Sequence, residues 1–159
     1  MRVRNAFSLL IVLYAFVFAS SINAETNQAL ASKGFAHYEA DEYEEAIAVL
    51  TELVELEPDN ANYHHTLAKS YGRQAEQVNW FKAINYAQKT LEHLEIAVSI
   101  EPRNVKYLGD LMDYYNEAPA FLGGDKKKAA SIKARIDGLI TNNTPYYSGK
   151  LDRNNLEGQ

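Results

Sequence analysis

Two stretches of the chain repeat each other almost residue by residue. The segment "LTELVELEPDN" at 50–60 is matched by "LEIAVSIEPRN" at 94–104. In both, apolar residues recur at helical spacing and a proline, Pro58 or Pro102, stands where a helix has to end. A chain that repeats one helical unit buries the apolar face of each unit against the next unit. The sequence therefore predicts an all-α solenoid of stacked antiparallel helix pairs.

The segment 34–63 resembles the tetratricopeptide repeat, a helix–turn–helix unit with a period of about 34 residues. The resemblance is carried by small, aromatic and proline positions, namely Gly34, Tyr38, Tyr43, Ala46, Leu50 and Pro58. Small residues such as Gly34 and Ala46 let two antiparallel helices approach closely. The resemblance implies an α–α superhelix of three helix pairs, in which the first helix of each pair lines a concave surface. It also implies that the protein holds another protein and has no catalytic step.

The second repeat is longer than the period of this family. Pro58 and Pro102 are 102 − 58 = 44 residues apart, about ten more than the usual period. Apolar residues keep helical spacing through the extra segment, at Trp80, Ile84, Ala87, Leu91, Leu94 and Val98. We therefore expect both helices of the second pair to be lengthened, by about five residues each.

The segment "EAPAFLGGDKKKA" at 117–129 admits two interpretations. A phosphate-binding loop has the pattern G-x-x-x-x-G-K-[ST] after a strand, whereas here two adjacent glycines follow a helix and no hydroxyl follows the lysines. Because predicted helices at 105–118 and 125–140 flank the segment, we interpret it as the enlarged turn of the third repeat.

Each unusual residue of this turn then has an expected structural role. Pro119 would stop the preceding helix, and Gly123 and Gly124 would allow a positive φ or a close approach of the backbone. Phe121 is expected to cover Trp80 at the tip of the lengthened hairpin, so that the turn clasps repeats 2 and 3 together. A lengthened second repeat with an "AP…GGD" turn is similar to a group of exported bacterial tetratricopeptide proteins.

The first 24 residues have the pattern of a secretory signal peptide. Arg2 and Arg4 precede an apolar run at 6–19, whose 14 residues are fewer than the roughly 20 that cross a bilayer as a helix. We expect cleavage after Ala24, or after Ala19, with no insertion in a membrane afterwards. The expected organisation is a signal peptide at 1–24, a helical domain at 25–140 and a flexible, polar tail at 141–159.

The net charge and the absence of cysteine limit the kinds of partner and the cellular location that we expect. Removal of residues 1–24 leaves a formal charge of 14 − 21 = −7, which disfavours nucleic acid and anionic lipid as partners. The chain has no cysteine, and this excludes disulfides and thiolate metal sites. Export without disulfides favours a bacterial periplasm.

No catalytic pattern stands out in the sequence. The histidines His37, His64, His65 and His93 do not form an H-E-x-x-H motif, and we expect them to be solvated or to lie at helix interfaces. We predict no catalytic residue, no metal and no cofactor. A hydrolase or metal-binding protein is the least favoured alternative.

The resemblance assigns candidate binding residues to the concave surface. They are Gln28, Ala31, Phe35, Tyr38 and Glu39 in the first repeat, Asn62, His65, Lys69 and Arg73 in the second, and Lys106, Asp113, Asn116 and Glu117 in the third. Lys69, Arg73 and Lys106 would form a basic strip suited to a carboxylate or an acidic segment of a partner. The alternative is that these cations pair with neighbouring Glu and Asp side chains. Tyr71 and Tyr115 are expected in the core.

The predicted function is a non-enzymatic module that binds a protein or peptide in the concave groove, in the bacterial periplasm. The alternative is a structural subunit in the assembly of a cell-envelope complex. The partner and the oligomeric state are left open by the sequence.

Overall fold

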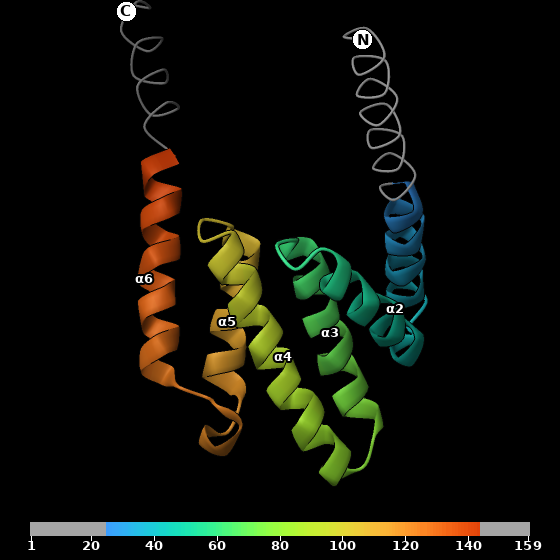
Figure 1. The fold of residues 1–159 in the computed structure, drawn as a ribbon. Helices are drawn as coiled ribbons and strands as arrows, with labels where there is room; N and C mark the ends of the chain where they lie inside the picture. The colour runs from blue at the N-terminus through green and yellow to red at the C-terminus, as the bar shows by residue number, and fades with distance from the viewer. Residues whose placement is uncertain (1–24, 144–159) are drawn as a thin grey trace, which may run out of the picture.

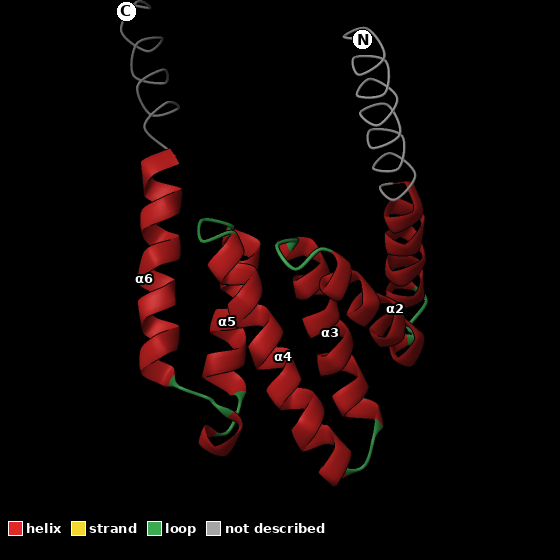
Figure 2. Cartoon of the chain, viewed as in Figure 1, coloured by secondary structure: helices red, strands yellow, loops and turns green. Residues whose placement is uncertain are grey.

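The computed structural model describes residues 25–143, which are helical apart from short turns (Figures 1 and 2). The predicted signal peptide and residues 144–159 of the predicted tail lie outside this part of the chain. A helix at 25–39 is followed by α2 (Tyr43–Leu56), α3 (Ala61–Gln77), α4 (Trp80–Ile100), α5 (Val105–Glu117) and α6 (Lys126–Asn143). α6 thus continues three residues beyond the predicted domain boundary at 140.

Consecutive helices pack side by side as three antiparallel pairs (Figure 1). The pairs are 25–39 with α2, α3 with α4, and α5 with α6. No strand occurs between residues 25 and 143. The predicted all-α solenoid of three helix pairs is therefore confirmed.

The turns between pairs are set by the repeated proline motif. α2 ends two residues before Pro58, and the side chain of Asn60 accepts a hydrogen bond from a backbone N–H of α3. In the same way α4 ends two residues before Pro102, and Asn104 accepts hydrogen bonds from two N–H groups of α5. Each "EP-x-N" segment thus stops one helix and caps the next.

The second pair is lengthened in both helices, but unequally. α3 has 17 residues against 13 in α5, a difference of 17 − 13 = 4. α4 has 21 residues against 14 in α2, a difference of 21 − 14 = 7, which adds about 10 Å at 1.5 Å per residue. The hairpin of α3 and α4 therefore projects beyond its neighbours at one end of the molecule (Figure 1).

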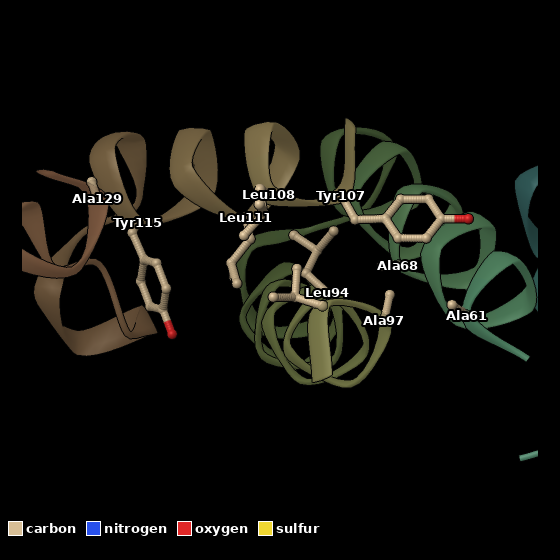
Figure 3. Close-up of a cluster of buried hydrophobic side chains, with 10 residues drawn as sticks. Ala61, Ala68, Leu94, Ala97, Tyr107, Leu108, Leu111, Tyr115 and Ala129 are labelled. Atoms are coloured by element: carbon tan, nitrogen blue, oxygen red, sulfur yellow. The ribbon is translucent and has the colours of Figure 1, made fainter. Parts of the chain in front are cut away.

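Two apolar clusters hold the pairs together. One joins the first pair to α3, and there a Cβ atom at Gly34 would lie 3.1 Å from Cγ1 of Val49, while Ala46 is fully buried. This confirms the close helix approach expected at both small residues. The other joins α3 and α4 to the third pair. In Figure 3, Leu108 of α5 lies over Leu94 of α4.

The turn between α5 and α6 has the backbone geometry expected from its glycines. Gly123 has a φ of +94°, in the left-handed region, and a Cβ atom at Gly124 would overlap the backbone carbonyl of Ala118. α5 ends at Glu117, ahead of Pro119. The carboxylate of Asp125 accepts hydrogen bonds from two backbone N–H groups of α6.

The expectation that this turn covers the hairpin tip is wrong. The rings of Trp80 and Phe121 do meet, with centroids 6.0 Å apart, but the two side chains remain 60% and 61% exposed. The turn offers only the short 3-10 helix η1 (Ala120–Leu122), which has no buried residue and leaves most of the Trp80 ring in solvent. The turn is held instead by the hydroxyl of Tyr114, which lies 2.8 Å and 2.9 Å from the carbonyl oxygens of Ala87 and Leu122.

Candidate binding groove

Two adjoining hollows lie along the first helices of the three pairs. The smaller, of about 200 Å³, is formed by the helix 25–39, α3 and the start of α5. The larger, of about 410 Å³, lies between α3 and α5 and has α4 as its floor. Tyr38 and Lys69 line both hollows, so that the two form one continuous groove.

All eight residues singled out for binding line this groove. The smaller hollow contains Phe35, Tyr38, Asn62, His65, Lys69 and Lys106, and the larger contains Arg73 and Asp113 in addition to Tyr38 and Lys69. Glu39 and Glu117, which the same register assigned to the groove, also line it. Helices far apart in the sequence thus bring these side chains together, as the repeat register requires.

Three residues of the wider assignment lie elsewhere. Ala31 is buried in the core of the first pair, and Gln28 lines neither hollow. Asn116 lines a separate hollow with residues of α6. Gln28 and Ala31 share a helix face with Phe35 but lie two turns and one turn nearer the start of that helix, beyond the hollow. Asn116 is turned away from the face shared by Lys106, Asp113 and Glu117.

The sequence reasoning missed Asp110, which lines the larger hollow. Its carboxylate oxygen Oδ2 lies 2.5 Å from Nε2 of His65, a side chain that is only 1% exposed and packs against the ring of Tyr107. The hydrogen bond from His65 lowers the pKa of Asp110, and the charges of Lys69 and Lys106 lower it further. His65 therefore holds the carboxylate of Asp110 in place, and almost none of its side chain is exposed to a partner.

A signal for Asp110 was present in the helix spacing. Positions 106, 110, 113 and 117 recur at intervals of four, three and four residues and carry charged side chains throughout. Such spacing places them on one face of a helix.

The cations of the groove differ in their surroundings. The ammonium of Lys69 lies 4.6 Å from the centre of the Tyr38 ring, a cation–π contact. Arg73 donates a hydrogen bond to the hydroxyl of Tyr43 and forms an ion pair of 2.7 Å with Glu76. For Arg73, the alternative of pairing with a neighbouring acid is thus the observed arrangement.

The expected basic strip is confined to one end of the groove. Among the residues that line the smaller hollow, Lys69 and Lys106 stand against one carboxylate, Glu39, which gives 2 − 1 = +1. The carboxylate of Asp110, held by His65, lies beside both lysines. The larger hollow holds two cations, Lys69 and Arg73, and four carboxylates, from Glu76, Asp110, Asp113 and Glu117, which gives 2 − 4 = −2. Counted over its lining residues, the groove therefore changes sign along its length. Lys69 and Lys106 lie at the positive end, whereas Arg73 of the expected basic strip is paired with Glu76.

A second histidine cluster lies at the interface of α3 and α4. Nδ1 of the buried His64 is 2.9 Å from Nδ1 of His93, and Nε2 of His64 is 2.9 Å from the carbonyl oxygen of Pro58. The ring of His93 stacks on Tyr71 at 5.8 Å. Burial, the neighbouring His64 and the charge of Lys89 lower the pKa of His93 to about 4.

Stability is expected to fall as the pH drops from about 6.5 towards 4, because the unfolded chain binds a proton at His93 that the folded chain excludes. One such proton changes the free energy of unfolding by at most about 1.4 kcal/mol per pH unit. Since His93 is partly exposed, we expect about 1–2 kcal/mol over this range. Urea unfolding at several pH values measures the loss.

The matched control for this prediction is His93→Phe, which keeps an aromatic ring against Tyr71 but cannot bind a proton. The variant should lose less stability than the wild type over the same pH range. Equal slopes in the two proteins would show that other groups carry the pH dependence.

Within residues 25–143, no three His, Cys, Asp or Glu side chains are grouped so as to bind a metal ion. None of the helices described there combines the length and apolar character needed to cross a bilayer.

Comparison with known proteins supports the assignment of the fold. Residues 34–74 match the family described as TPR repeat. The solved structure titled "MamA RS-1 ArsTM double mutant" resembles the chain with a TM-score of 0.61 and 22% sequence identity, over 75% of this chain. The chain spans 58% of the length of that protein. No curated protein sequence matches the chain.

The fold is accordingly a TPR-like α–α superhelix. Helical repeats of this type are typically non-catalytic and serve protein–protein interaction or scaffolding.

Proposed function

We propose that the groove binds a segment of another protein and that the chain acts in the bacterial periplasm. The observation that carries the binding proposal is the convergence of Phe35, Tyr38, Asn62, Lys69 and Lys106 in one hollow. These residues come from all three helix pairs, so no single pair could form the surface. The signal-like residues 1–24 and the absence of cysteine support the location.

The charge pattern defines the chemistry of the bound segment. Lys69 and Lys106 at the positive end suit a carboxylate, while Asp113 and Glu117 at the negative end suit a Lys or Arg side chain. Phe35, which is half-buried, offers its ring for an apolar contact beside Lys106. The preferred partner is thus a peptide with an acidic and a basic residue at a fixed separation.

Reversal of both cations in the variant Lys69→Glu/Lys106→Glu is expected to weaken binding by at least about tenfold, or 1.4 kcal/mol. The two new carboxylates would then repel the carboxylate of the peptide and that of Glu39, which lines the same hollow. The measurement selects short random peptides on the wild-type protein and compares their affinities for the variant by fluorescence anisotropy. Circular dichroism confirms that the variant keeps its helical content.

The control Lys33→Glu/Arg103→Glu makes the same change of charge at exposed positions outside the groove. Its affinity for the selected peptides should equal that of the wild type. A similar loss in both variants, or selected peptides without a shared charge pattern, would contradict binding in the groove.

A further inference from the structure

The hairpin of α3 and α4 ends in aromatic side chains that the groove does not use. Phe81 is 83% exposed, and the paired rings of Trp80 and Phe121 are 60% and 61% exposed. None of the three lines either hollow of the groove. We call these three residues the aromatic tip. Large apolar side chains that gather on a projecting surface commonly mark an interaction site.

The surroundings of the aromatic tip are positively charged. Residues 78–83 and 117–128 contain four lysines, Lys82, Lys126, Lys127 and Lys128, and two acids, Glu117 and Asp125, which gives 4 − 2 = +2. Lys128 is paired with Glu95 at 3.7 Å, and the carboxylate of Asp125 caps α6. The exposed lysines that remain beside the tip are therefore Lys82, Lys126 and Lys127. This local charge is opposite to the formal charge of −5 of the whole chain.

The opposite end of the molecule is acidic. A hollow there is lined by Glu57, Asp59 and Glu101, in the turns that join one pair to the next. Figure 1 shows these turns at one end of the helices, and the α3–α4 turn together with η1 at the other. Exposed lysines therefore gather at one end of α3 and α4, and carboxylates at the other end.

We propose that the aromatic tip adsorbs to the surface of an anionic lipid bilayer. Aromatic rings are favoured at the membrane interface, and lysines beside them attract anionic headgroups while their stems lie along apolar surface. Trp80 and Phe81 begin α4 and Phe121 lies in η1, and all three rings are mostly exposed, so the surface of a bilayer can contact them. The chain would lie on the bilayer and would not cross it.

Distance decides between this local attraction and the repulsion expected from the overall charge. α4 has 21 residues and is therefore about 31 Å long at 1.5 Å per residue. The Debye length at physiological salt is about 8 Å. With the tip on the bilayer, the carboxylates of Glu57 and Glu101 lie several screening lengths away, and the lysines of the tip dominate. The argument from net charge against anionic lipid thus does not apply to this end.

Trp80 provides the probe, because it is the only tryptophan of the sequence. The test uses residues 25–159, since the apolar run at 6–19 would bind lipid by itself and both core clusters lie within residues 25–143. Vesicles of phosphatidylcholine with phosphatidylglycerol should sediment the protein and shift the Trp80 emission to shorter wavelength. Vesicles of phosphatidylcholine alone should bind it at least about tenfold less, and salt should weaken the binding.

Two sets of variants separate the contributions. Phe81→Ser/Phe121→Ser should lower partitioning into the anionic vesicles at least about tenfold, and Lys82→Gln/Lys126→Gln/Lys127→Gln should remove the preference for anionic lipid. All these side chains are exposed, so the fold should persist. The groove variant Lys69→Glu/Lys106→Glu should adsorb like the wild type, which keeps this test independent of peptide binding.

Three results would overturn the proposal. The first is no sedimentation with anionic vesicles. The second is equal partitioning of the wild type and Phe81→Ser/Phe121→Ser. The third is a shift of the Trp80 emission that needs no vesicles and grows with protein concentration, which would identify the aromatic tip as a contact between copies of the chain.

Discussion

Substitution of Gly124 by Ala is expected to lower the free energy of unfolding by about 2–4 kcal/mol. A Cβ atom at this position would overlap the backbone carbonyl of Ala118. The turn cannot easily move away, because the N–H of Gly124 donates to the carbonyl oxygen of Pro119 and the N–H of Asp125 to that of Tyr115. The clash must be relieved by breaking at least one of these hydrogen bonds or by displacing α6.

Urea unfolding followed by circular dichroism tests this prediction against two controls. Gly138→Ala, in α6 with no atom near its Cβ position, should instead stabilise the protein by up to about 1 kcal/mol. Phe121→Ala removes a side chain that is mostly exposed and should cost less than about 1 kcal/mol. Equal effects of Gly124→Ala and Gly138→Ala would show that the turn is not held as the structure describes.

The helix pairs and their ends followed from local chemistry that a sequence displays directly. Pro58 and Pro102 cannot continue a helix, and Asn60 and Asn104 are good N-cap residues. The close approach at Gly34 followed from its size. The helix ends depend on residues within one turn of a helix, and the close approach at Gly34 depends on a small residue that faces Val49 and Leu50. All of these features are present in the structure.

The failed expectations concern distances between elements that are separate in the sequence. Periodicity showed that Trp80 and Phe121 would lie at the same end, and their rings do meet. It could not show that α4 gains seven residues and α3 four relative to their neighbours. The contact between the two rings leaves both mostly exposed, because the short η1 has no buried residue. How far one ring covers another thus depends on the length and placement of a turn, which helical spacing alone does not determine.

The electrostatics of the groove were missed for a related reason. The sequence register placed Lys69, Arg73 and Lys106 on one surface, and all three line the groove. The acids that surround them come partly from the same helices, as Glu76 does, and partly from another helix, as Asp110 does. Because the prediction counted only the cations, it described the charge of the smaller hollow and missed the excess of carboxylates in the larger one.

The largest loss of stability is expected for Leu108→Ala, at about 2–5 kcal/mol. Leu108 is fully buried in the cluster that joins α3 and α4 to the third helix pair. In a solenoid each repeat is stabilised mainly by its neighbours, so a cavity at this interface weakens the attachment of α5 and α6. α5 also supplies Lys106 and Asp110 to the groove, and peptide binding should fall as the third pair detaches.

Amide hydrogen exchange distinguishes this outcome from a general loss of stability. In Leu108→Ala, the amides of residues 105–143 should lose protection first, while those of α2 and the first half of α3 remain protected. Leu50→Ala, at a fully buried position in the other cluster, should reverse the order by exposing the first pair. Leu108→Met, which nearly conserves the side-chain volume, should cost less than about 1.5 kcal/mol. If both alanine variants lose protection evenly along the chain, the two clusters form a single cooperative unit and the groove can open only by global unfolding.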